Sequence, residues 1–136
     1  MENMIGLLII SHCDVGKELL NAAELIMGRL EAASAISITQ TTESEALLKT
    51  ISKEIKALDR GQGVLILTDM FGGTPSNLSF SFLKEGAVDV LTGVNLPMVV
   101  EVAQNRQRLT LSELGEKAKE AGTRGIALGG KLLKSQ

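Results

Sequence analysis

The alternation of fully apolar runs with amphipathic segments is the feature that most limits how this chain can fold. Two runs, MIGLLIIS (4–11) and GVLILTD (63–69), are apolar at nearly every position, which is typical of strands covered on both faces. Two others, AISITQ (35–40) and AVDVLTG (87–93), carry polar residues and suit strands nearer a sheet edge. Strands buried on both faces occur in α/β proteins, so we expect a mostly parallel sheet between helices.

Segments with apolar residues at helical spacing separate these four runs. The expected helices lie at 14–30 and 43–58, from Thr74, from Pro97, and at 111–121. Right-handed crossovers would place such helices on both faces of the sheet. We therefore expect one doubly wound α/β domain over residues 1–136.

Side chains that can cap a helix mark four of these starts, and Asp14 is the candidate N-cap of the first. Thr42 with Glu45, and Thr110 with Glu113, have the spacing of a capping box. Thr74 is predicted to cap the short helix that begins near it.

The apolar content of the runs also predicts their order in the sheet. The two most apolar runs, the first and the third, should be central, which gives the order 2-1-3-4 with a switch point between strands 1 and 3. A short apolar run near the end, GIALG (125–129), is predicted as an additional short edge strand.

The only histidine of the chain lies where the first strand should end. In open α/β sheets, ligands bind beyond the carboxyl ends of the strands at the switch point. Ser11 and His12 lie at this end of the first strand, and Asp69 lies at the same end of the third. We expect a carboxylate to accept the Nδ1 proton of the imidazole, which leaves Nε2 as a nucleophile.

The loop after Asp69 adds a place for a small anion. Gly72 and Gly73 allow a close approach of the backbone, and the helix that starts at Thr74 would present unpaired N–H groups. A histidine, an orienting carboxylate and an anion site suggest phosphoryl chemistry on the imidazole. Each feature alone is more often structural, and their convergence at one switch point favours the functional interpretation.

Composition excludes several other classes of function. The formal net charge is −2 and aromatic residues make up 2% of the chain, which disfavours nucleic-acid binding and stacking platforms. No apolar run is long enough to span a membrane, and no secretory signal is evident at the N-terminus. Cys13 is the only cysteine, so neither an intrachain disulfide nor a protein-built metal site is expected.

Three motifs carry a resemblance that extends over essentially the whole chain. They are the apolar strand ending in SH (11–12), the block DMFGGTPSN (69–77), and TGVNLPMVVE (92–101). In these motifs the sequence resembles the mannose-type IIA component of the bacterial phosphoenolpyruvate-dependent sugar phosphotransferase system.

The resemblance implies roles for individual residues. His12 would accept a phosphoryl group from the phosphohistidine of the carrier protein HPr and pass it to a histidine of the IIB component, which makes the protein a phosphotransferase. Asp69 would orient the imidazole, and the Thr74 hydroxyl would lie beside the phosphoryl group with Gly72 and Gly73. Ser11 and Asn77 are expected to support the site.

The resemblance also implies partners and an assembly. Family members are dimers that exchange a C-terminal strand, which would assign GIALG a purpose. The membrane components IIC and IID are expected as indirect partners of a cytoplasmic protein without a cofactor. IIB is expected to be a separate protein, because no Ala/Pro-rich linker follows the IIA motifs.

Two departures and two alternatives accompany this assignment. Many members have glycine where this chain has Cys13, and others have tryptophan where it has Phe71. A regulatory phosphocarrier without sugar transport would use the same phosphohistidine. The phosphocarrier of dihydroxyacetone kinase has a related fold, but the full GGTPSN block favours the mannose type. The transported sugar leaves no trace in the sequence.

Overall fold

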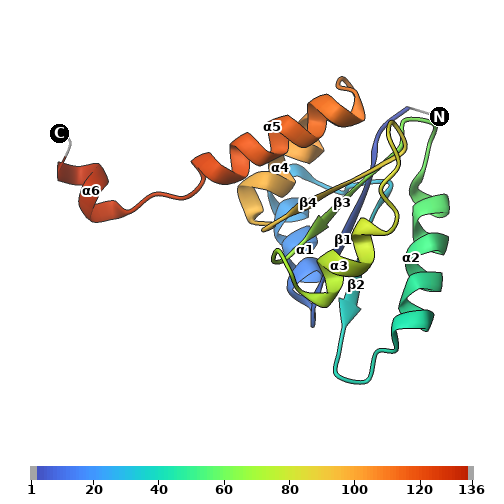
Figure 1. Ribbon diagram of the computed structural model, residues 1–136. Coiled ribbons are helices and arrows are strands. Elements are labelled where there is room, and N and C mark those ends of the chain that lie inside the picture. The colour runs from blue at the N-terminus through green and yellow to red at the C-terminus, as the bar shows by residue number, and fades with distance from the viewer. Residues whose placement is uncertain (1–2, 135–136) are drawn as a thin grey trace.

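A computed structural model describes residues 3–134 and shows a parallel sheet between two layers of helices (Figure 1). The strands are β1 (Gly6–His12), β2 (Ala33–Ile38), β3 (Val64–Thr68) and β4 (Val88–Thr92). Their order is β2-β1-β3-β4, and every neighbouring pair is parallel. The predicted α/β class and the predicted strand order are both confirmed.

Successive side chains of a strand point to opposite faces of the sheet. Alternate residues of the central strands therefore belong to two separate apolar cores. Leu7, Ile9, Leu65 and Leu67 face one layer, and Leu8, Ile10, Val64 and Ile66 face the other. All eight are completely buried. β1 and β3 are therefore covered on both faces, which explains their continuous apolar sequences.

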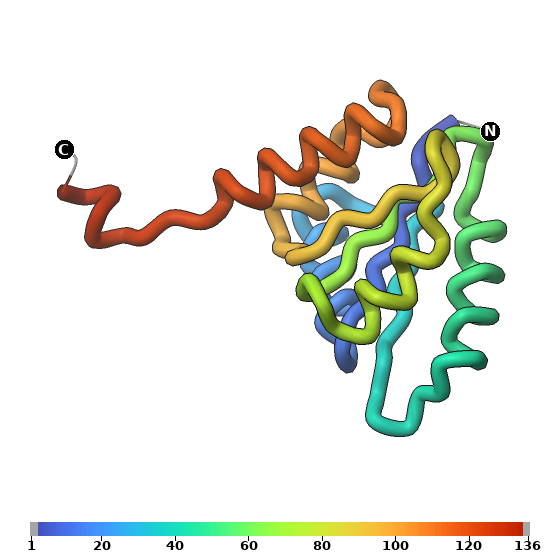
Figure 2. The backbone as a smooth tube through the Cα atoms, viewed as in Figure 1, coloured from blue at the N-terminus to red at the C-terminus, as the bar shows by residue number. Residues whose placement is uncertain are grey.

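The helices form the two layers that cover these cores (Figure 2). One layer contains α1 (Val15–Met27), α4 (Leu96–Asn105) and α5 (Leu111–Arg124), and the other contains α2 (Ser44–Leu58) and α3 (Thr74–Phe80). Between residues 3 and 134, no helix is long and apolar enough to cross a bilayer.

The register of the central strands sets the position of the predicted site. Ile10 of β1 lies opposite Thr68 of β3, and this is the last residue pair between the two strands. Ser11 and His12 extend β1 beyond that pair, while Asp69 follows β3 directly. The two predicted functional side chains therefore emerge at the same edge of the sheet.

Of the predicted helix caps, only one makes its capping hydrogen bonds, because Asp14 is the N-cap residue of α1 but its side chain makes no such bond. Thr110 and Glu113 form the complete capping box at the start of α5. The box predicted for Thr42 and Glu45 is wrong: α2 begins one residue later than expected, and the Thr42 hydroxyl accepts a hydrogen bond from the Thr39 N–H instead. The predicted cap at Thr74 is also wrong, because Thr74 is already helical and the N-cap is Gly73.

The predicted edge strand at GIALG is not formed in this single chain. Helix α5 continues to Arg124, and residues 126–128 then lead away from the sheet to a short helix, α6 (Gly129–Lys134) (Figure 1). Along this course the segment reaches no sheet edge of its own chain with which to pair. Ile126 and Leu128 are 76% and 71% exposed.

The capping box of α5 makes a pH-dependent contribution to stability. The hydrogen bond from the Thr110 backbone, followed by the bond with the Thr110 side chain, lowers the pKa of the Glu113 carboxyl from its ordinary value of 4.5. A carboxyl group with a lowered pKa stabilises the fold above its unfolded pKa and loses this contribution as the pH falls through the folded pKa.

We therefore expect Glu113→Ala to be less stable than the wild type at neutral pH, with a difference that shrinks below about pH 4. Urea denaturation across a pH series measures this difference. Glu116→Ala on the exposed side of the same helix is the control and should show no comparable trend. A Glu113→Ala difference that stays constant down to the acid range would contradict the assignment.

Candidate functional site

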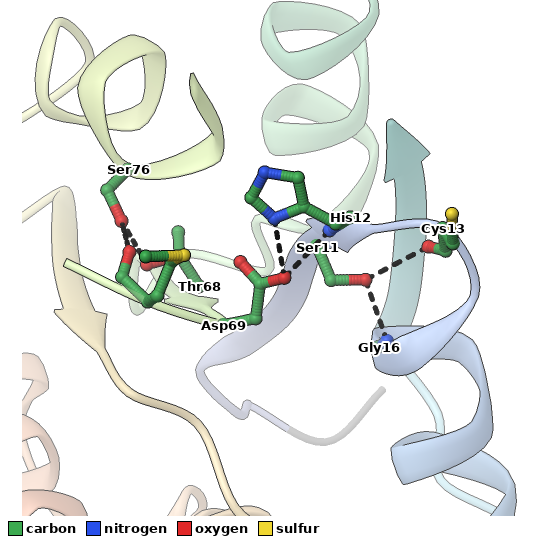
Figure 3. Close-up of polar contacts among 8 residues, drawn as sticks. Ser11, His12, Cys13, Gly16, Thr68, Asp69 and Ser76 are labelled. Carbon is green, nitrogen blue, oxygen red and sulfur yellow. Dashed lines mark hydrogen bonds and ion pairs between the residues drawn. The ribbon is translucent and has the colours of Figure 1, made fainter. Parts of the chain in front are cut away.

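The histidine predicted at the end of β1 is bonded to the aspartate that follows β3 (Figure 3). The His12 ring Nδ1 lies 2.8 Å from Asp69 Oδ2. The His12 backbone N–H also donates to Oδ2, at 2.8 Å. One carboxylate oxygen thus holds both the backbone and the ring of His12, which fixes the ring relative to the sheet.

This arrangement selects one tautomer of the imidazole. An ionised carboxylate can only accept hydrogen bonds, so Nδ1 must carry the proton that lies between the two groups. Nε2 then holds a lone pair, and it points away from Asp69 (Figure 3). The His12 side chain is 49% exposed while that of Asp69 is 15% exposed. The pair therefore presents a fixed and accessible nucleophilic nitrogen.

The second oxygen of Asp69 is buried without a partner. Among the described residues, Asp69 Oδ1 is the one buried side-chain oxygen or nitrogen that makes no hydrogen bond. Leaving a buried acceptor unpaired costs about 1–3 kcal/mol. A buried polar atom without a partner calls for an explanation, and a role in the chemistry of the site is one such explanation.

A buried hydroxyl shapes the turn that follows His12. Ser11 Oγ accepts from the Gly16 N–H at 2.8 Å and donates to the Cys13 carbonyl at 3.1 Å. Cys13 adopts a φ of 49°, in the left-handed region that favours glycine. A side chain at this position is thus accommodated at some backbone cost, while the Ser11 hydroxyl holds the two ends of the turn together.

The glycine loop approaches the imidazole closely. A Cβ atom on Gly73 would lie 3.1 Å from His12 Cε1, and Gly72 has a φ of 88°. Asn77 supports this loop, since its Nδ2 donates to the Gly72 carbonyl at 3.3 Å and its backbone N–H donates to the Gly73 carbonyl at 2.9 Å. Thr74 is exposed at the start of α3, and its side chain makes no hydrogen bond within residues 3–134.

One further residue of this region, Ser76, was not predicted from the sequence. Ser76 is completely buried in the first turn of α3. Its Oγ lies 2.6 Å from Thr68 Oγ1 and donates to the Met70 carbonyl. The sequence held one sign of this role. Ser76 is a polar residue directly after Pro75, in a short helix that was expected to pack near the end of a buried strand.

The donor set of the site suits an anion better than a cation. Among residues 3–134, no group of three or more His, Cys, Asp or Glu side chains is arranged to hold a metal ion. His12 and Asp69 form a pair only, and the facing loop offers glycine backbone and a hydroxyl. These features define the chain as an α/β protein with a His–Asp pair at the switch point of its sheet.

Comparison with known proteins identifies the family to which this chain belongs. The family model described as "PTS system fructose IIA component" (EIIA-man) matches residues 6–119. The chain belongs to this family, the mannose-type IIA components of the bacterial sugar phosphotransferase system, and so has a phosphocarrier role in that system.

Individual relatives agree with this membership. The chain is 34% identical over 111 residues to the sorbose-specific EIIA component of Lacticaseibacillus casei, covering 79% of this chain and 78% of that protein. It is 32% identical over 112 residues to the fructose-specific EIIA component of Bacillus subtilis, covering 82% and 77%. It is 31% identical over 124 residues to the mannose-specific EIIAB component of Escherichia coli, covering 90% of this chain but 38% of that longer protein.

Solved structures show the same fold over nearly the whole chain. The phosphotransferase system component EIIA of Streptococcus agalactiae superposes with a TM-score of 0.85 at 26% identity, covering 94% of this chain and 99% of that one. A IIA protein of Streptococcus pneumoniae, associated with a fucose utilization operon, gives a TM-score of 0.83 at 25% identity, covering 98% and 99%. Both neighbours share the fold of this chain over nearly its whole length.

The close approach of Gly73 to the imidazole generates a prediction. Gly73 has a φ of −84°, so its backbone tolerates alanine, but the added methyl group would press on the ring. We expect Gly73→Ala to displace the ring from Asp69 and to weaken or abolish the downfield NMR signal of the proton on Nδ1. Gly115→Ala in α5, where a Cβ would meet only Asp89 Oδ2 at 3.6 Å, is the control. An unchanged signal in Gly73→Ala would refute the tight contact.

Proposed function

We propose that His12 accepts a phosphoryl group from the phosphohistidine of HPr and passes it to a histidine of a separate IIB component. In this proposal residues 1–136 form one cytoplasmic IIA-type domain, which needs no cofactor and serves sugar uptake through the membrane components IIC and IID. The observation that carries the proposal is the bond from His12 Nδ1 to Asp69, which leaves Nε2 exposed for attack.

Transfer along this route exchanges one phosphorus–nitrogen bond for another. The lone pair on His12 Nε2 forms the new P–N bond while the P–N bond to the donor imidazole breaks, and its electron pair returns to the donor ring nitrogen. The proton on His12 Nδ1 stays in place. Because the bond broken and the bond made are of the same kind, little net free energy separates donor and acceptor, and the group can move onward.

Asp69 would act on the charge that develops during this step. The His12 ring becomes positive as Nε2 bonds to phosphorus, and a carboxylate 2.8 Å from Nδ1 stabilises that charge. The backbone of Gly72 and Gly73 and the hydroxyl of Thr74 are the groups proposed to face the phosphoryl oxygens. Ser11 and Asn77 would hold the two loops that carry these groups.

The exposure of the site suits donors and acceptors that are proteins. Beside the half-exposed His12, the loop after Asp69 presents Met70 and Phe71, which are 52% and 76% exposed. Large apolar side chains around a reactive group are typical of a surface that binds other proteins. A small-molecule substrate would instead be expected to bind in an enclosed pocket.

The direct test of this function is phosphorylation by phosphoenolpyruvate, enzyme I and HPr. We expect one phosphoryl group per chain, on His12, labile in acid and stable in base because it is bound to nitrogen. His12→Ala should take up no label and keep its fold, since the side chain lies at the mouth of a loop. Label that persists on His12→Ala would disprove the assignment.

A second prediction concerns the orienting carboxylate. Asp69→Asn keeps the size of the side chain but can donate to Nδ1, so it allows the wrong tautomer. Loss of the comparable carboxylate in a serine-protease triad costs about 10⁴ in rate. Here the proton stays on Nδ1 throughout, and we expect a smaller loss in phosphorylation rate, about 10- to 10³-fold. Quench-flow kinetics measure this loss. A wild-type rate in Asp69→Asn would mean that the carboxylate has only a structural role in the turn.

We further propose that two copies of the chain form a homodimer by exchanging their C-terminal segments. The exposed apolar side chains of this segment have no core to enter in their own chain: Ile126, Leu128, Leu132 and Leu133. β4 ends the sheet, and beyond the bridge between Val88 and Lys84 its outer edge pairs with no other strand of residues 3–134. A cavity of about 380 Å³ lies along β4, lined by Phe71, Phe80 and Leu91 among others, and could receive such side chains from a second copy.

Truncation tests the dimer. A chain that ends after Gly125 keeps α5 intact and loses the exposed apolar segment. We expect the full-length protein to sediment as a dimer at micromolar concentration and the truncated chain as a monomer or an aggregate. Leu128→Asp should have the same effect without shortening the chain. A full-length monomer would rule out the exchange.

A further inference from the structure

The hydroxyl of Ser76 links three separate parts of the site. Ser76 Oγ donates its one hydrogen to the Met70 carbonyl, so the 2.6 Å contact with Thr68 Oγ1 must be a bond that Thr68 donates. The resulting chain runs from the last residue of β3, through the first turn of α3, to the loop. Ser76 and Thr68 are completely buried, and the bond to the Met70 carbonyl is partly buried.

This chain of hydrogen bonds holds the residues on both sides of Asp69. Thr68 precedes Asp69 in the sequence and Met70 follows it, so both neighbours of the carboxylate residue are bonded to one hydroxyl. Figure 3 shows the contact between Ser76 and Thr68. Thr68 is already fixed by β1 and β4, whereas Met70 lies in an exposed loop. The bond to the Met70 carbonyl therefore sets the direction in which the chain leaves β3.

The same bond bears on the glycine that touches His12. Residues 71–73 connect Met70 to α3, and a Cβ on Gly73 would lie 3.1 Å from His12 Cε1. Asn77 holds the outer side of this loop through Gly72, but Asn77 is exposed to solvent. Of the two side-chain hydrogen bonds that α3 donates to the loop, only that of Ser76 comes from a completely buried residue, which shields it better from competition by water.

We propose that Ser76 is a positioning residue of the His12 site, whose buried hydroxyl places Asp69 Oδ2 on the imidazole Nδ1. Ser76 touches neither the ring nor any phosphoryl group, and it acts through Thr68 and Met70. The proposal concerns the geometry of the His–Asp pair. It rests on the proposed function only where a transfer rate is measured.

The same helix supplies a matched control. Ser79 lies three residues after Ser76, is also completely buried, and donates its hydroxyl to the Pro75 carbonyl at 2.5 Å within α3. Replacing Ser79 by alanine removes a buried hydrogen bond and the same oxygen atom, but leaves the loop contacts untouched. A general loss of stability should affect both variants, and a positioning effect should appear only at Ser76.

The tautomer of His12 gives a readout that needs no partner protein. Because His12 is the only histidine in the chain, long-range ¹H–¹⁵N spectra show a single imidazole. At a pH where the ring is neutral, we expect the wild type and Ser79→Ala to hold the proton on Nδ1. In Ser76→Ala the population should shift toward the Nε2–H form that free histidine favours, and Ser76→Thr should restore the wild-type spectrum. Identical tautomer populations in Ser76→Ala and the wild type would overturn the proposal.

A second variant tests the same hydrogen bond in case Ser76→Ala does not fold. Thr68→Val removes the donor at the other end of the same bond and keeps the shape of the side chain. It frees the Ser76 hydroxyl from one of its two restraints, so we expect a tautomer shift in the same direction. If neither Thr68→Val nor Ser76→Ala shifts the tautomer, Ser76 is merely a buried structural residue.

Transfer rates provide the functional half of the test. We expect Ser76→Ala to slow phosphorylation by phospho-HPr about 10- to 10²-fold, as a small displacement of a reacting group does. The loss should nearly vanish when Ser76→Ala is made in Asp69→Asn, because both changes disturb one contact. Additive losses would contradict action through Asp69. If the wild type itself takes no phosphoryl group, the proposed function fails, and the tautomer measurement still decides the role of Ser76.

Discussion

Both hydrogen bonds that His12 donates to Asp69 depend on the register between β1 and β3. With Ile10 opposite Thr68, His12 and Asp69 meet just beyond the last pair of the ladder. A slip of one residue would turn every side chain of the strand to the other face of the sheet. It would also move His12 relative to Asp69 by about 3.3 Å along the strand. The ring nitrogen and the carboxylate would then be too far apart for a hydrogen bond.

Apolar patterning alone cannot hold this register, because both faces of β1 and β3 are buried and apolar. Glycines at the amino ends of the strands supply the missing restraint. A Cβ on Gly6 would lie 2.6 Å from the Leu58 carbonyl oxygen, and one on Gly63 would lie 2.8 Å from the Ala87 carbonyl oxygen. Sliding β1 by one residue would bring Ile5 or Leu7 against Leu58. Close backbone packing at one end of the sheet thus fixes the reactive pair at the other.

The parts of this structure that could be predicted from the sequence are those that local apolarity encodes. Continuous apolar runs marked the central strands, their order placed the switch point, and the switch point brought His12 and Asp69 together. Ser76 escaped prediction because its partners, Thr68 and Met70, are set by tertiary contacts of a short helix. The box expected at Thr42 failed since Thr42 bonds to the preceding turn. GIALG has the composition of a strand, but after α5 the chain leads this segment away from the sheet, so it reaches no strand with which to pair.

The central claim is that Asp69 holds the proton on Nδ1 of His12 and leaves Nε2 to react. The most direct measurement is the site of phosphorylation on the ring, read from ¹H–¹⁵N and ³¹P couplings of the phosphorylated, ¹⁵N-labelled protein. The account predicts phosphorus on Nε2, with the proton on Nδ1 still bonded to Asp69. Phosphorus on Nδ1 would mean that the bond to Asp69 is broken in the reaction, and the account would be contradicted.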